Sequence, residues 1–233
     1  MNVMTRLSGK MKLAEMVDLN HRLLGILARL GFKPGFGETT VAESCSRYGI
    51  NLPTFLMICN VYSSEEFIPT EEDLREIDIM AVVRYLRASH RYYVNKGLVC
   101  LSDQLEQVLE PCGEKPKKVI RSFFGQYKTE LEKHFEYEER QVFPYVQALS
   151  AGDGSVRDDL RQVEDDHGNI EEKVDDLKNI ILKYLPAECD IVGVADVLTF
   201  IYNLAEDLKY HTRIEDIILA PLITKLEEDG NDR

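Results

Sequence analysis

Apolar residues recur at helical spacing along most of the chain after residue 71, and no segment alternates apolar and polar residues for long. An apolar residue at every third or fourth position is typical of amphipathic α-helices that bury one face. Turn-like segments rich in proline and glycine interrupt this pattern at 111–116, 151–154 and 186–193. The pattern predicts four long helices, at about 71–109, 117–149, 156–184 and 194–226. Because short connections favour antiparallel neighbours, we expect an all-α, up-down-up-down four-helix bundle.

The residues before the bundle have a different pattern. Shorter apolar segments lie within residues 1–62 and predict a small helical N-terminal domain. A polar stretch that ends in proline follows, and because proline disfavours helix in the residue before it, we expect a linker at 63–71. The bundle is then expected over 72–227, and the polar residues 228–233 are expected to form a frayed tail.

Composition and charge narrow the class of protein. A chain of 233 residues with 44% hydrophobic residues can bury a large core. Its net charge of −13 opposes binding to nucleic acid and to anionic membranes. No apolar run approaches the roughly 18 residues of a membrane helix, and the first residues lack the apolar centre of a signal peptide. We therefore expect a cytoplasmic protein that has no membrane partner.

The cysteines do not suggest a cross-linked protein. Their number is odd, their positions are spread along the chain, and no Cys-x-x-Cys pair occurs: the five are Cys45, Cys59, Cys100, Cys112 and Cys189. We expect buried thiols without a chemical role and no disulfide framework.

An internal repeat lies within the predicted bundle. From His90 to His134 is 44 residues, and from His167 to His211 is again 44, so the two halves are offset by 77. The same offset relates the acidic pair at 138–139 to the one at 215–216, and relates Pro144 to Pro221. We expect each proline to kink or end its helix at an equivalent place.

The repeat predicts a metal site inside the bundle. Residues four apart lie on one face of a helix, so His134 can bind together with Glu138, and His211 with Glu215. His90 and His167 would each add one imidazole from the other two helices. Glu139 and Asp216, directly after the carboxylates, are expected on another helix face, in solvent.

The donor set indicates the kind of metal. Four imidazoles and two carboxylates without a thiolate favour iron or another borderline divalent ion over magnesium or structural zinc. We therefore expect two non-haem iron ions, with other divalent metals as substitutes. The alternative is that the two His-x-x-x-Glu motifs are ordinary surface pairs on a bundle that binds no metal.

These motifs resemble the hemerythrin-like (HHE cation-binding) family over residues 72–227. The residues that carry the resemblance are His90, His134-Phe-Glu-Tyr-Glu138-Glu139 with Phe143-Pro144, His167, and His211-Thr-Arg-Ile-Glu215-Asp216 with Pro221. The resemblance implies that the four histidines are terminal ligands and that Glu138 and Glu215 bridge the two metals. A small helical domain ahead of the bundle is similar to the iron–sulfur cluster repair (RIC) proteins. Their adjacent N-terminal cysteines are missing here, where residues 32–37 read Phe-Lys-Pro-Gly-Phe-Gly.

The resemblance implies a stress-response protein that binds or reduces nitric oxide or dioxygen, or that repairs iron–sulfur proteins. Whether the chain is an enzyme or only binds its ligand is open, and a second copy of the chain is a further candidate partner. The alternative function is a di-iron sensor whose first domain binds a partner or DNA. Residues 40–55 have the helix, glycine turn and helix of a helix-turn-helix, although few polar residues near the second helix could contact phosphates.

Overall fold

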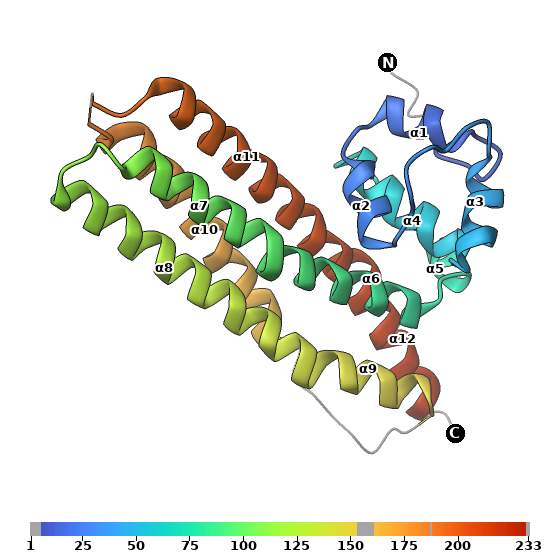
Figure 1. Ribbon diagram of the computed structural model, residues 1–233. Helices are drawn as coiled ribbons and strands as arrows, with labels where there is room; N and C mark the ends of the chain where they lie inside the picture. The colour runs from blue at the N-terminus through green and yellow to red at the C-terminus, as the bar shows by residue number, and fades with distance from the viewer. Residues whose placement is uncertain (1–5, 153–160, 187, 232–233) are drawn as a thin grey trace. The chain divides into compact units, whose positions relative to one another are not determined.

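The computed structural model describes residues 6–152, 161–186 and 188–231, and the side chains of 161–167, 169, 171, 230 and 231 lie outside this description. Regular structure in these residues is helical, apart from one isolated bridge between Lys12 and Thr40. Long helices over residues 79–229 form the bundle, and shorter helices precede them (Figure 1). The predicted all-α fold is confirmed.

Four short helices occupy the N-terminal region: α1 (Leu13–Leu19), α2 (Leu23–Arg29), α3 (Val41–Tyr48) and α4 (Leu52–Ser63). Thr40 begins α3 with a capping box, in which its side chain accepts from the Glu43 amide while the Glu43 carboxylate accepts from the Thr40 amide. Gly49 ends α3 in the left-handed conformation, with a φ of 65°, which favours glycine. The expected helix, glycine turn and helix are therefore present.

The prediction that the first long helix begins at about residue 71 is wrong, because a separate short helix precedes it. Thr70 forms a capping box with Asp73, but it begins the five-residue helix α5 (Glu71–Arg75). The long helix α6 (Ile79–Tyr92) begins after Asp78, whose carboxylate accepts from the Ala81 amide at 3.1 Å. The Asp78 amide donates to the Thr54 hydroxyl of α4 at 3.0 Å, and this hydrogen bond holds the connection between α5 and α6.

Three of the long helical runs contain a π-helical segment. The first run is α6, η1 (Tyr93–Gly97) and α7 (Leu98–Leu109), and the second is α8 (Glu114–Tyr137), η2 (Glu138–Val142) and α9 (Phe143–Ser150). The third run is the single helix α10 (Arg161–Tyr184), and the fourth is α11 (Ile191–Ile214), η3 (Glu215–Leu219) and α12 (Ala220–Asn231). The predicted start of the third helix at Val156 lies outside the described residues, and the last helix continues past Leu226 into the polar tail.

Neither proline of the repeat ends its helical run, and the two occupy equivalent positions. Pro144 and Pro221 are each the second residue of the α-helix that follows a π-helical segment. In a regular α-helix the ring of Pro144 would meet the carbonyl of Arg140. The wider π-turn relieves that clash, and in it the Phe143 amide donates to the Glu138 carbonyl five residues earlier.

The chain divides into two compact units, one formed by the described parts of 1–89, 146–156 and 213–233, the other by those of 90–145 and 157–212. The second unit contains α7, α8, α10 and α11, which run side by side as the four antiparallel helices of the bundle (Figure 1). Its core is a continuous apolar cluster with buried Leu101, Leu131, Leu177 and Ile201, one from each helix. The predicted boundaries at 62 and 72 stay a prediction.

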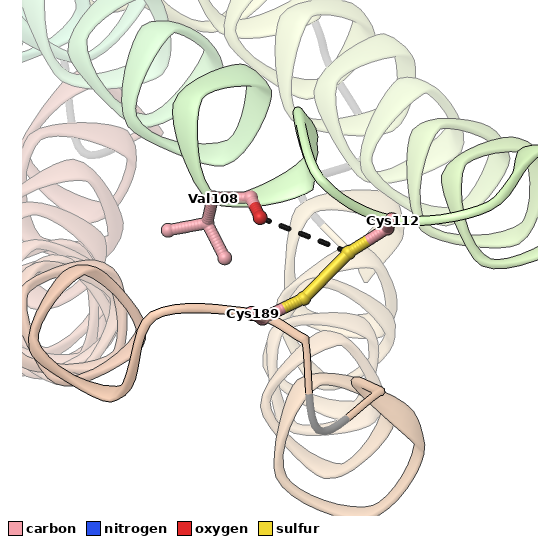
Figure 2. The surroundings of a disulfide bond; sticks show 3 residues. All are labelled: Val108, Cys112 and Cys189. Carbon is pink, nitrogen blue, oxygen red and sulfur yellow. Dashed lines mark hydrogen bonds between the residues drawn. A yellow bond between two sulfur atoms is a disulfide. The ribbon is translucent and has the colours of Figure 1, made fainter.

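The expectation that no cysteine is cross-linked is wrong for one pair. Cys112, in the connection between α7 and α8, forms a disulfide with Cys189, in the connection between α10 and α11 (Figure 2). The backbone carbonyl of Val108 lies next to Cys112 Sγ, at 3.7 Å. Cys45 and Cys59 are buried free thiols as expected, whereas Cys100 is exposed. None of the described helices is long and apolar enough to cross a membrane.

Candidate metal centre

Two of the π-helical segments, η2 and η3, begin at the carboxylates of the repeat. Glu138 is the first residue of η2 and Glu215 the first residue of η3, and both segments obey the offset of 77 along their whole length. Such single π-turns within α-helices are frequent at functional sites, because they redirect the side chains that follow. The repeat seen in the sequence is therefore also a repeat of backbone geometry.

Three of the predicted ligands meet inside the bundle unit, each from a different helical run. His90 Nε2 lies 3.1 Å from Glu138 Oε2 and 3.2 Å from His211 Nε2. All three side chains are buried, with at most 4% of the surface of each residue exposed. The convergence of helices one, two and four that the repeat predicted is thus present.

Glu215 completes the group. It follows His211 by four residues in the same helical run and is buried. One ligand atom from each of His90, Glu138, His211 and Glu215 lies within 4.8 Å of the other three. Two imidazoles and two carboxylates at this separation are suited to holding a metal ion.

Of the two remaining predicted ligands, His134 and His167, the structure describes the side chain of His134 alone. His134 is buried, and its Nε2 lies 3.5 Å from Glu138 Oε2, so it borders the same group through the carboxylate. His167 lies on α10, but its side chain is outside the described residues. Its role as a ligand stays a prediction.

Glu139 contradicts the expectation that it lies in solvent away from the site. Its Oε1 lies 3.1 Å from His90 Nδ1, and its side chain is only 35% exposed. Because an ionised carboxylate can only accept a hydrogen bond, Nδ1 is the protonated nitrogen in this contact. The other ring nitrogen, Nε2, is the one that faces Glu138 and His211.

Aromatic rings enclose the same imidazoles. The ring of His90 is stacked with Phe135 and Phe143, with centroids at 4.2 and 5.4 Å. Tyr93, one of four tyrosines near the predicted ligands, lies edge-on to His211 at 5.5 Å, and its hydroxyl donates to the Asp207 carbonyl. These contacts fix the ring planes and exclude water from one side of the group.

The charges of the site fit a metal cation. Two carboxylates, Glu138 and Glu215, are buried, whereas none of the lysines and arginines whose side chains the structure describes is buried. Burying a carboxylate is costly unless a positive charge or hydrogen bonds compensate it. The His90 and His211 Nε2 atoms, 3.2 Å apart, are also close enough to bind one cation together.

A known protein family matches the part of the chain that contains these residues. The hemerythrin HHE cation binding domain matches residues 81–229, which include all six predicted ligands. No curated protein matches the chain.

Proposed function

The chain belongs to the hemerythrin HHE cation-binding family, and we propose that its bundle holds two non-haem iron ions that bind a small oxidant such as nitric oxide or dioxygen. The convergence of His90, Glu138 and His211 within 3.2 Å of His90 Nε2 is the observation that carries the proposal. Iron bound in this way would supply redox chemistry and open coordination positions for a diatomic ligand.

We propose that the ligands fall into two sets. His90 and His211 have adjoining Nε2 atoms, so we assign both to one metal position. His134 Nε2 lies 3.5 Å from the same Glu138 oxygen, Oε2, and comes from another helical run than His90 and His211. We assign it, with His167, to the second position. Glu138 and Glu215 would then bridge the two ions, as the family resemblance implies.

Iron–sulfur cluster repair under nitrosative or oxidative stress is the cellular role that we propose. It is supported by the short helices ahead of the bundle and by a donor set that suits iron. The region of the missing cysteine pair, residues 32–37, lacks a thiol, so no thiol chemistry there is part of the proposal. Damaged iron–sulfur proteins, and a second copy of the chain, are the proposed macromolecular partners.

We propose a cytoplasmic location, and the Cys112–Cys189 disulfide provides a test of it. Disulfides in the cytosol are rare and are mostly transient or redox-sensing. Rapid acid quenching and alkylation of cells that make the chain should trap these two cysteines mostly as thiols if the location is cytoplasmic. A fully oxidised pair in unstressed cells would contradict the proposed location.

The alternative, a sensor whose first domain binds DNA, is less well supported. Eight residues of α4, the second helix of the helix-turn-helix outline, are buried. The polar residues at its start serve the fold: Asn51 Oδ1 accepts from the Thr54 amide and hydroxyl, and the Thr54 hydroxyl accepts from Asp78. A helix buried in this way has little surface left for a groove of DNA. Retention of random duplex by micromolar protein at low salt would favour the sensor instead.

Metal content tests the proposed function directly. The chain purified from iron-supplied cells should contain about two irons, as carboxylate-bridged bundle proteins do, and should absorb in the near-ultraviolet and visible through ligand-to-metal charge transfer. Nitric oxide added anaerobically should change that spectrum. Glu138→Ala should lower the iron content, whereas Glu136→Gln, at an exposed residue paired with Arg140, should leave it unchanged. Absence of bound metal after anaerobic reconstitution would overturn the proposal.

A further inference from the structure

We propose that Glu139 is a positioning residue that fixes His90 as an Nε2 donor and so sets the affinity of the metal position that His90 serves. The inference rests on the proposed metal centre. It assigns a role to a carboxylate outside the six predicted ligands, which the sequence pattern placed in solvent.

Two consecutive carboxylates hold the two nitrogens of one ring. Glu138 Oε2 lies 3.1 Å from His90 Nε2, and Glu139 Oε1 lies 3.1 Å from His90 Nδ1. Consecutive residues of a regular α-helix point about 100° apart and do not normally reach one side chain. These two are the first residues of the π-helical segment η2, where the backbone departs from that spacing.

Stacking alone leaves one orientation of His90 undecided. Phe135 and Phe143 fix the plane of the ring, with interplanar angles of 19° and 17°. A half-turn of the ring within that plane would exchange nitrogen for carbon at both edges. The two carboxylates remove the ambiguity together, because each faces a ring nitrogen. Of the two, Glu139 accepts from Nδ1–H and so leaves Nε2 on the side of the proposed metal.

The position of Glu139 suits this role energetically. Its side chain is 35% exposed, so water still solvates part of its charge, while His90 is buried. A carboxylate that accepts from the outer nitrogen of a ligating histidine raises the basicity of the inner nitrogen and holds the ring in place. Loss of such a partner typically lowers metal affinity by roughly 10- to 100-fold.

The two halves of the repeat differ in sequence at the residues that contact His90. The equivalent of Glu139 is Asp216, which is one methylene shorter, and the equivalent of Phe143 is Ala220. The ring stack and the longer carboxylate both act on His90. We therefore expect Glu139 to affect one of the two proposed metal positions more than the other.

The test compares Glu139→Ala, Glu139→Gln and the control Glu136→Gln, which makes the same charge change on the same helical run at an exposed pair. Anaerobic titration with Fe²⁺ against a competing chelator should show, in Glu139→Ala, one position weakened by roughly 10- to 100-fold and the other nearly unchanged. Glu139→Gln, whose amide oxygen can still accept from Nδ1–H, should recover most of the affinity. Glu136→Gln should titrate as the wild type does.

A second measurement reads the contact without any metal. In ¹⁵N-histidine-labelled metal-free protein at pH 8, the side-chain nitrogen shifts should report a proton on His90 Nδ1, and Glu139→Ala should shift the tautomer away from the form that carries this proton. An unchanged tautomer together with unchanged affinity in Glu139→Ala would overturn the inference. If the wild type bound no iron the proposed function would fail instead, and the tautomer would still decide whether Glu139 positions His90.

Discussion

Cys112 and Cys189 are joined by a disulfide and are separated by 77 residues, the same offset that relates His134 to His211 and Glu138 to Glu215. The cross-link therefore connects equivalent positions in the two halves of the repeat. Each cysteine lies in a connection between two long helices, one in each half. The bond ties the first helix pair of the bundle to the second.

Loss of this bond should destabilise the bundle. A cross-link that closes a loop of 77 residues restricts the unfolded chain, which in the chain-entropy account stabilises the fold by roughly 4 kcal/mol. We expect Cys112→Ser to lower the free energy of unfolding by about 2–4 kcal/mol under non-reducing conditions, as measured by denaturant unfolding followed by circular dichroism.

The control for this experiment is Cys100→Ser, because Cys100 is an exposed free thiol. This variant should unfold as the wild type does. In the presence of a strong reductant, the wild type and Cys112→Ser should have nearly the same stability. Equal stability of the two without reductant would mean that the bond adds nothing to the fold.

The free cysteines should differ sharply in reactivity. Burial raises the pKa of Cys45 to about 12 and raises that of Cys59 as well, whereas Cys100 is exposed. A raised pKa means that the thiolate, the form that reacts, is almost absent until the pH approaches that value. At pH 8 the native chain should therefore take up one iodoacetamide, at Cys100, as read by mass spectrometry.

The number of labels should increase when the chain is unfolded. The unfolded, non-reduced chain should take up three labels, and the unfolded, reduced chain should take up five. Rapid labelling of Cys45 in the native chain at pH 8 would contradict the described burial of the N-terminal helices.

A buried hydroxyl in the bundle offers a stabilising substitution. Tyr127 on α8 is 1% exposed, and within the described residues its hydroxyl has no hydrogen-bond partner. Burial raises the pKa of this hydroxyl as well, so it stays protonated at every ordinary pH. A buried polar group without a partner costs about 1–3 kcal/mol, so Tyr127→Phe should raise the free energy of unfolding by about 1 kcal/mol. A loss of stability in Tyr127→Phe would mean that the hydroxyl makes a favourable interaction and would contradict this prediction.

Much of the site could be predicted from the sequence, because it depends on residue spacings that are local and that repeat along the chain. The i,i+4 spacing of His211 and Glu215, repeated at an offset of 77, was enough to place them on one face of a helix. The four-helix pattern followed from the spacing of apolar residues and from the turn segments. These features depend on helix geometry alone, so no tertiary information was needed to predict them.

Three features were not predicted from the sequence, and two of them depend on departures from regular helix geometry. The π-turn beginning at Glu138 brings Glu139 to His90, which α-helical spacing does not predict. The same turn explains why Pro144 continues its helix rather than ending it. The disulfide could have been found, because Cys112 and Cys189 obey the offset of 77 that the histidines had already revealed.

The buried carboxylates should make the stability of the bundle depend on metal. Glu138 and Glu215 are at most 4% exposed and lie beside buried imidazoles. A cation that binds only the folded state stabilises it in proportion to the logarithm of its concentration, by about 2.7 kcal/mol at 100 times the dissociation constant. We expect metal-free wild type to gain at least this much on addition of saturating Fe²⁺ under anaerobic conditions, measured by thermal unfolding. Glu138→Gln should lose most of that gain, since a neutral amide compensates less of the charge of the cation. The exposed control Glu136→Gln should keep it. An equal gain in Glu138→Gln would show that the added metal binds elsewhere on this acidic chain.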